Sequence, residues 1–160
     1  LHLLNTSTNY VYIMTPYLIL DDELVRAMTF AARRGVDVRI IMPGIPDKQY
    51  AFDIATTYFK ALLEAGVRIF RYTPGFVHAK VYVSDAKQAV VGTINTDYRS
   101  LYQNFEDGIY LYKNPEVLHI EQDFERTQAL SEEVTLESLS KMPLVHRLSG
   151  YLFSLIGPLM

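Results

Sequence analysis

The pattern of apolar and polar residues divides the first half of the chain into alternating strands and helices. Runs rich in β-branched and aromatic residues, which are typical of strands, cover residues 10–17, 36–44 and 67–72. The two segments between these runs repeat apolar residues at helical spacing. Asp21 and Asp22 offer an N-cap for the first helix, and Gly35 and Gly66 are suited to end the two helices.

In the second half, strands cluster instead of alternating with helices. Residues 76–83 and 89–92 are predicted to form a hairpin around the loop SDAKQ, and residues 107–112 a further strand. A long helix is expected over residues 115–130. This order predicts one α/β domain over residues 1–160, with a mixed β-sheet and helices packed on both faces.

Length and composition narrow the class of protein. A chain of 160 residues can bury one full hydrophobic core, and the absence of cysteine excludes disulfides and cysteine-ligated zinc. The formal charge of −3 argues against a broad basic surface for nucleic acid. No apolar run reaches the roughly 18 residues of a membrane span. The apolar residues 148–160 are expected to form either a packed terminal helix or a helix at a membrane surface.

A histidine and a lysine stand side by side in the first strand of the predicted hairpin. Strand periodicity places His78 and Lys80 on one face. The alternate residues lie on the other face: Val77, Ala79, Val81 and Val83. Because burial of an unpaired ammonium is costly, Lys80 is expected to meet an anion or to face a cleft. If Val83 pairs with Ala89, then Lys80 lies opposite Gly92, where a ligand or the backbone can approach closely.

The same end of the hairpin gathers groups that suit a phosphoryl group. Thr93 adds a hydroxyl and Asn95 an amide to the imidazole of His78 and the ammonium of Lys80. A fixed positive charge with neutral donors can hold phosphate oxygens, and a histidine can attack phosphorus or move a proton. Each residue alone also has a structural interpretation: a core histidine, a lysine extended to solvent, a turn aspartate at Asp85 and an N-cap asparagine.

The joint spacing resembles the HKD signature of the phospholipase D superfamily. The matching positions are His78, Lys80, Asp85, Gly92 and Asn95. The stretches TPYLILDDEL, AARRGVDVRIIMPG, LLEAGVRIFRYTPGFVHAK and NTDYRSLYQNFE look like the second, C-terminal catalytic half of bacterial cardiolipin synthases. The resemblance covers nearly the whole chain. Thr93 departs from the serine that is usual in the family, but keeps the hydroxyl. The family has two such motifs in each active site, and this chain carries one.

The resemblance implies a role for each matched residue. His78 would belong to a pair of histidines, one forming a phosphohistidine and the other serving as general acid and base. Lys80 and Asn95 would hold the phosphate oxygens, with Thr93 as an additional donor. Glu106 would hold the other ring nitrogen of His78 and so stabilise the imidazolium. Asp85 would support the turn, and no metal or other cofactor is expected. The predicted catalytic residues are His78, Lys80, Asp85 and Glu106, and the predicted phosphate ligands are Lys80, Thr93 and Asn95.

The activity implied by the resemblance is that of a phosphatidyltransferase. Two phosphatidylglycerol molecules would condense into cardiolipin and glycerol through the phosphohistidine. The implied partners are an anionic phospholipid membrane and a second HKD half, in the same parent chain or in a homodimer; nucleic acid is not expected. The parent protein would lie at the bacterial inner membrane through upstream helices absent from this chain, which itself would be a soluble, cytoplasmic-type domain.

Two other interpretations remain open. The chain could be a one-motif phosphodiesterase or nuclease that acts as a homodimer, which the lone motif favours unless the chain is a fragment. It could also be an isolated half-domain that folds or binds lipid without turnover. The other histidines, His2, His119 and His146, are expected to be structural or solvated. Three aromatic residues are expected to flank the cleft: Tyr17, Phe76 and Tyr98.

Overall fold

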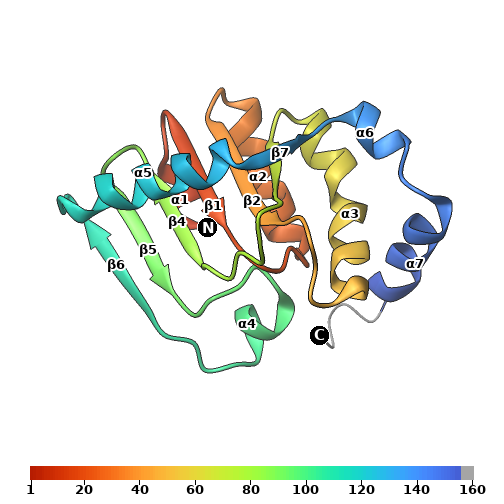
Figure 1. Cartoon of the computed structure of the whole chain (residues 1–160). Helices are drawn as coiled ribbons and strands as arrows, with labels where there is room; N and C mark the ends of the chain where they lie inside the picture. The colour runs from red at the N-terminus through yellow and green to blue at the C-terminus, as the bar shows by residue number, and fades with distance from the viewer. Residues whose placement is uncertain (156–160) are drawn as a thin grey trace.

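Over residues 1–155, which the structure describes, this computed structural model contains a seven-stranded mixed sheet with the order β6-β5-β4-β1-β2-β3-β7 (Figure 1). The strands are β1 (Tyr10–Met14), β2 (Asp37–Pro43), β3 (Arg68–Tyr72), β4 (Val81–Ser84), β5 (Gln88–Gly92), β6 (Gly108–Tyr112) and β7 (Ser131–Val134). The helices are α1 (His2–Thr6), α2 (Asp22–Arg33), α3 (Gln49–Glu64), α4 (Tyr98–Tyr102), α5 (Glu116–Ala129), α6 (Leu136–Ser140) and α7 (Leu144–Ser154). The three strands β1, β2 and β3 are parallel, and the other neighbouring pairs are antiparallel.

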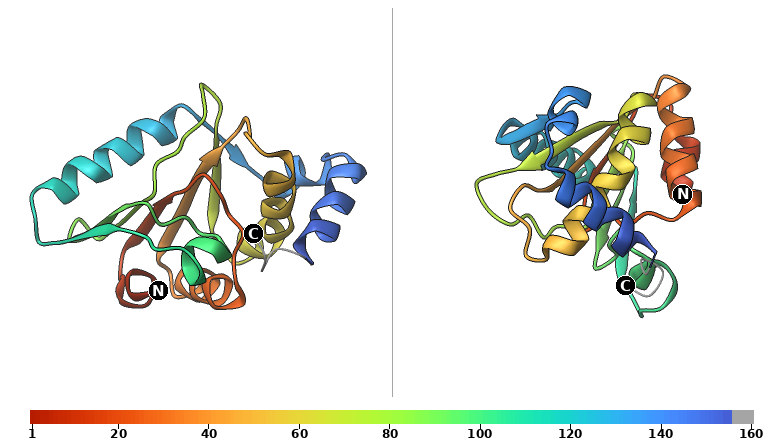
Figure 2. Two further views of the ribbon diagram at one scale, coloured as in Figure 1. Left: turned by 90° about the horizontal axis from the view of Figure 1, so that it is seen from below. Right: turned by 90° about the vertical axis from the view of Figure 1, so that its right-hand side faces the viewer.

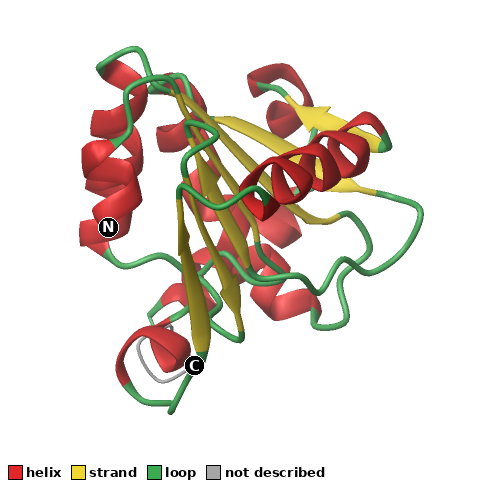
Figure 3. Cartoon of the chain, turned by 90° about the vertical axis from the view of Figure 1, so that its left-hand side faces the viewer, coloured by secondary structure: helices red, strands yellow, loops and turns green. Residues whose placement is uncertain are grey.

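The helices cover both faces of the sheet, as the sequence predicts (Figure 2). On one face, Val11 and Ile13 of β1 pack in a core that includes Met28 of α2 and Phe59 of α3. On the other face, the alternate residues of β1 pack in a core with Phe124 of α5. Figure 3 shows α5 and the helices α1 and α2 on opposite sides of the strands. Because successive side chains of β1 point to opposite faces of the sheet, the same strand contributes to both cores.

The predicted helix ends are confirmed. The Asp21 carboxylate caps α2 by accepting a 2.7 Å hydrogen bond from the backbone N–H of Leu24. Gly35 and Gly66 follow α2 and α3 with φ of 91° and 97°, in the left-handed region that glycine adopts without strain. No helix in the described part of the chain is both long enough and apolar enough to cross a membrane.

One strand start and one whole strand differ most from the sequence prediction. The strand expected over residues 76–83 begins only at Val81, because β1 pairs with it as far as Met14 and then leaves the sheet before Pro16. The strand β7 is not predicted from its sequence, SEEV, which lacks apolar alternation. Tertiary pairing with β3 supports it, through ion pairs of Arg68 with Glu133 at 2.8 Å and Arg71 with Glu132 at 3.2 Å.

The turn between β4 and β5 is tied to the start of β1 by one carboxylate. Asp85 accepts hydrogen bonds from the backbone N–H groups of Thr8, Asn9 and Tyr10 at 2.8, 3.0 and 2.9 Å, and from the Thr8 hydroxyl at 3.2 Å. Burial opposes ionisation of this group, but the hydrogen bonds together outweigh burial and lower the pKa of Asp85. Asp85 thus supports the turn, and it also fixes the hairpin against the central strand.

Replacing Asp85 with Asn is predicted to lower the free energy of unfolding by about 2–3 kcal/mol at neutral pH, since an amide cannot accept all four hydrogen bonds. Because the folded-state pKa is depressed, this stabilisation is present above the ordinary aspartate pKa of about 3.9. It is lost as the pH falls through the lower folded-state pKa. Urea titrations followed by circular dichroism should therefore show the two proteins converging in acid.

The matched control is Asp123→Asn, because Asp123 is exposed on α5 and makes a 3.3 Å ion pair with Arg126. Its removal is expected to change stability by at most about 0.5 kcal/mol. Equal losses in the two variants at neutral pH would contradict the anchoring role of Asp85.

Candidate active site

The antiparallel hairpin delivers the predicted site residues to one end of the sheet. Val83 pairs with Ala89, as predicted, and the backbone N–H of Gly92 donates to the Lys80 carbonyl at 3.2 Å. His78 and Lys80 therefore lie just before the start of β4, next to the end of β5. The same edge holds the carboxyl ends of the parallel strands, which is where open α/β sheets bind ligands.

His78 and Lys80 are in direct contact at this edge. The Lys80 ammonium lies 3.0 Å from each ring nitrogen of His78 and donates to the His78 carbonyl at 2.8 Å. The His78 side chain is exposed, and the ring of Phe76 stacks on it with a centroid distance of 5.8 Å. Val77 and Ala79, between the polar residues, pack on the α5 core, so the predicted division of faces is confirmed.

Lys80 is the half-buried cation of the site. Partial burial lowers its pKa, and the negative charges of Glu106 and Asp97 oppose that shift. In the described part of the chain, no carboxylate forms an ion pair with Lys80. Of the two predicted environments for this ammonium, an anion or a cleft, the described residues supply anions only at longer range, and the cleft stays a prediction.

Glu106 is held by one donor on α4 and by two donors just after β5 and α4. It accepts hydrogen bonds from Thr93, from the Ser100 hydroxyl at 2.8 Å and from the Asn104 amide at 3.2 Å. The bonds from Thr93 and then Ser100 lower the pKa of Glu106 and keep it ionised. Across residues 1–155, the hydrogen bonds of Glu106 go to these groups and not to His78, so a contact with the ring nitrogen stays a prediction.

The hydroxyl of Thr93 is engaged within the protein. It donates to Glu106 and accepts a 3.0 Å hydrogen bond from the backbone N–H of Asp107. A role as phosphate donor, which the sequence predicts, would require this hydroxyl to leave Glu106. In the geometry observed, Thr93 instead fixes the carboxylate near Lys80.

Gly92 is required by the backbone of the next strand. A Cβ atom at this position would lie 2.2 Å from the carbonyl oxygen of Asp107 and 2.6 Å from the Cα of Gly108. The sequence left open whether a ligand or the backbone approaches Gly92, and the structure shows the backbone. This close approach positions Glu106, two residues before β6, beside the end of β5.

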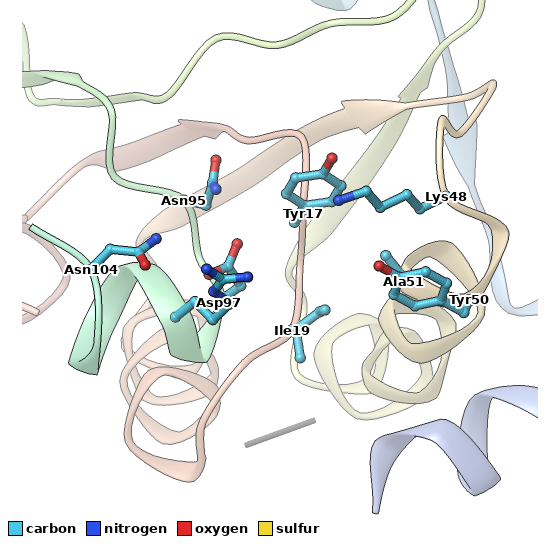
Figure 4. A pocket seen from close by; sticks show the side chains of 9 residues that line it. Tyr17, Ile19, Lys48, Tyr50, Ala51, Asn95, Asp97 and Asn104 are labelled. Atoms are coloured by element: carbon cyan, nitrogen blue, oxygen red, sulfur yellow. The ribbon is translucent and has the colours of Figure 1, made fainter. Parts of the chain in front are cut away.

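Asn95 lines an adjacent cavity of about 300 Å³ (Figure 4). Its side-chain oxygen is buried and has no hydrogen-bond partner in the described part of the chain. The following residue, Thr96, is fixed by a 2.6 Å hydrogen bond from its hydroxyl to the Tyr17 carbonyl. Lys48 and Arg99 line the same cavity, and a ligand group that donates a hydrogen bond would satisfy the amide oxygen. The other residues lining the cavity are Tyr17, Ile19, Tyr50, Ala51, Asp97 and Asn104.

Several of these residues could not be found from the sequence. Ser100, Asn104 and Lys48 reach the site only because the chain folds back through α4 and the start of α3. Of the aromatic residues predicted to flank the cleft, Tyr17 lines the cavity and Phe76 stacks on His78. The third, Tyr98, packs instead in a cluster with residues of α3.

The fold defines the class of this protein. It is similar to that of Nuc from Salmonella typhimurium, a phospholipase D family member, with a TM-score of 0.72 at 17% identity, over 83% of this chain and 86% of that one. Residues 1–128 match the family described as the cardiolipin synthase, PLD-like domain. The chain therefore belongs to this family of phospholipase D-like domains.

Two relatives extend the match to nearly the whole chain. An uncharacterized protein of Streptococcus mutans is 54% identical over 158 residues, and a cardiolipin synthase of Clostridium perfringens is 39% identical over 158 residues. Each match covers 99% of this chain. The chain spans only 34% and 33% of the lengths of these two proteins.

Replacing Gly92 with Ala is predicted to lower the free energy of unfolding by about 1–3 kcal/mol, because the added methyl group forces β5 and β6 apart. The matched control is Gly108→Ala, where the nearest atom to a new Cβ, in Ile94, is 3.5 Å away. That change is expected to stay within about 0.5 kcal/mol. Urea unfolding of both variants measures the difference, and equal stabilities would contradict the close approach.

Proposed function

We propose that this chain is one catalytic half of a cardiolipin synthase-type phosphatidyltransferase, which condenses two phosphatidylglycerol molecules into cardiolipin and glycerol. The observation that carries the proposal is the 39% identity to a cardiolipin synthase over 99% of the chain. The contact of His78 with Lys80 at the ligand-binding edge of the sheet supports it. The closely matched relatives are about three times as long, which supports the interpretation of this chain as one half of an active site.

The chemistry needs two histidines, of which this chain supplies His78. One histidine attacks the phosphorus of phosphatidylglycerol, forming an N–P bond while the bond to the glycerol oxygen breaks. The other donates its proton to the departing glycerol. It then removes a proton from a hydroxyl of the second phosphatidylglycerol, whose oxygen displaces the first histidine. Which role belongs to His78 depends on the second half.

Lys80 and Asn95 would bind the oxygens of the phosphate that lies between the two histidines. The ammonium of Lys80 would offset the negative charge of the non-bridging oxygens, which persists through the transition state of phosphoryl transfer. The amide of Asn95 could turn its N–H₂ group toward the same oxygens. Glu106, held ionised by Thr93 and Ser100, would stabilise positive charge on Lys80 and on a protonated His78.

The His78 side chain and several apolar side chains of the same half are exposed, and a second half would cover them. His78 is exposed, and Phe105, beside Glu106, is fully exposed. The strand β6 lies at the edge of the sheet and exposes Ile109 and Tyr110. Exposed apolar side chains next to a catalytic residue favour a covering partner. We propose that the partner is a second histidine–lysine half, in the same polypeptide or in a second copy, and that the enzyme works at an anionic phospholipid membrane.

A second candidate is a phosphodiesterase or nuclease built from two copies of this chain. The observation that favours it is the likeness to Nuc, since this chain covers 86% of that protein and so is close to it in size. The two candidates share the proposed histidine chemistry and differ in the group that enters, which is a lipid hydroxyl in one and water in the other. The isolated chain without turnover is the third outcome that an assay can reveal.

Replacing His78 with Ala is predicted to abolish formation of cardiolipin and glycerol, because no other group of this half can take the place of the imidazole. The assay uses the protein in which this chain is joined to a second half, in phosphatidylglycerol vesicles, with the products followed by mass spectrometry. The control is His119→Ala, since His119 is exposed on α5 and contacts Glu116. Substantial activity in the His78→Ala protein would contradict the covalent mechanism.

The wild-type result separates the candidates. Cardiolipin with glycerol is expected for the transferase, whereas cleavage of DNA without cardiolipin would favour the nuclease. The isolated chain, assayed in parallel, shows whether one half turns over alone.

Replacing Lys80 with Ala is predicted to lower kcat by about 10²–10³-fold, equivalent to ~3–4 kcal/mol of lost transition-state stabilisation. The rate of glycerol release at saturating phosphatidylglycerol measures this effect. The control is Lys87→Ala, since Lys87 is exposed in the same hairpin. An effect on KM with unchanged kcat would show that Lys80 only binds substrate.

A further inference from the structure

The last described helix, α7, is attached to the protein by its polar side. Asp53 of α3, which is only 3% exposed, accepts hydrogen bonds from the His146 ring at 3.0 Å and from the Ser149 hydroxyl at 2.6 Å. Gly150 lies directly on α3, because a Cβ atom there would be 2.3 Å from the Asp53 carbonyl oxygen. Polar hydrogen bonds and a close backbone contact therefore hold this helix in place.

The opposite side of α7 is apolar and exposed. Six large side chains occupy it, and each is between 60% and 78% exposed: Leu144, Val145, Leu148, Tyr151, Leu152 and Leu155. Their spacing places them within an arc of about 120° on the helix. We call these six residues the α7 stripe. An ordinary surface helix turns its apolar side to the core, and α7 does the reverse.

The charged residue that borders the α7 stripe is basic. The helix α7 contains no acidic residue, and Arg147 flanks the stripe. Arg147 also lines a groove of about 320 Å³ between α3, α6 and α7, in which Lys60 and Glu64 form an ion pair at 3.8 Å. In the part of the chain that the structure describes, no ion pair involves Arg147. An apolar stripe flanked by an arginine without an ion pair, on a helix without acidic residues, fits an anionic lipid surface.

The packed side of α7 faces the residues that line the candidate cavity. The helix packs on the outer side of α3, at the end of the molecule away from β6 (Figure 1). The ring of Phe153, on α7, lies 6.0 Å from that of Tyr50, and Tyr50 lines the cavity that contains Asn95. Phe153 belongs to the side of α7 that packs on α3, so the α7 stripe points away from this contact.

We propose that the α7 stripe lies in the surface of an anionic phospholipid bilayer, with its apolar side chains among the upper acyl chains and Arg147 at the headgroup phosphates. The choice of a bilayer as occupant rests on the proposed function, since the substrate there is a lipid. The helix is about 16 Å long, which suits it to lie in the interface and is too short to cross. The sequence predicts that residues 148–160 form either a packed helix or a membrane-surface helix. In this proposal, residues 148–155 do both, because one side of α7 packs on α3 and the other side contacts the membrane. Residues 156–160 lie outside the described part of the chain.

The test is binding of the chain to vesicles of mixed phosphatidylglycerol and phosphatidylcholine, measured by co-sedimentation. Leu148→Gln combined with Leu152→Gln is expected to weaken partitioning on the order of 10- to 100-fold, because two exposed leucines lose their lipid contacts. The matched control is Leu118→Gln with Leu130→Gln, which changes two exposed leucines at and just beyond α5. Arg147→Gln should weaken binding roughly fivefold on the mixed vesicles and leave binding to pure phosphatidylcholine unchanged.

Three results with the chain by itself would overturn the proposal. They are failure of the wild-type chain to bind vesicles, equal binding by the stripe variant and its control, and sedimentation velocity showing a dimer that only the stripe variant disrupts. The same binding assay is repeated with the chain joined to its second half. Loss of vesicle binding in the joined protein would show that the second half covers the stripe, and would also overturn it.

A second measurement does not depend on how the double variant folds. The chain has no cysteine, so Leu148→Cys carries a single polarity-sensitive dye, with Leu118→Cys as the control. A blue shift on adding vesicles is expected at position 148 and not at 118, and shifts of equal size would contradict the proposal. Vesicle binding is measured without turnover, so a protein that binds through the stripe but makes no cardiolipin would refute only the proposed function.

Discussion

The carboxylate of Asp85 joins the β4–β5 turn to the start of β1, and the position of the candidate active site depends on this junction. Its four hydrogen bonds hold the turn against the central strand of the sheet. Because the turn is fixed and Val83 pairs with Ala89, the register of the hairpin also determines the position of its other end. That end carries His78 and Lys80 to the edge where the parallel strands finish. A structural aspartate at one end of the hairpin therefore orients the chemistry at the other.

A second constraint acts at the far side of the same hairpin. Because Gly92 has no side chain, the backbone before β6 comes close enough for Thr93 to bond with Glu106. Glu106 remains ionised near Lys80, so the site combines an exposed imidazole, a half-buried ammonium and a fixed carboxylate. The charges of Lys80 and Glu106 are opposite, and the His78 side chain is exposed. The proposed function relies on this exposure, because a second half would have to reach His78.

The molecule also exposes apolar residues on two separated surfaces. One surface, with Phe105 and β6, lies next to Glu106 at the edge of the sheet, and the α7 stripe lies at the opposite end of the molecule, beyond α3 (Figure 1). The two cores on the faces of the sheet are already covered by helices. Apolar side chains at the edge strand β6 and on the outer side of α7 therefore remain exposed. In the two proposals, these surfaces make different contacts, the first with a second half and the α7 stripe with a lipid bilayer.

The sequence by itself determined the α/β class, the order of most elements, the hairpin register and the family, because these follow from local periodicity, turn residues and the spacing of His78, Lys80 and Asn95. It could not determine β7, whose SEEV sequence is a strand only through pairing and ion pairs with β3. Tertiary structure alone decided that Gly92 admits a backbone, that Thr93 binds Glu106, and that α7 turns its apolar side outward. Each of these depends on contacts between segments distant in sequence, and a pattern along one segment does not record what packs against it.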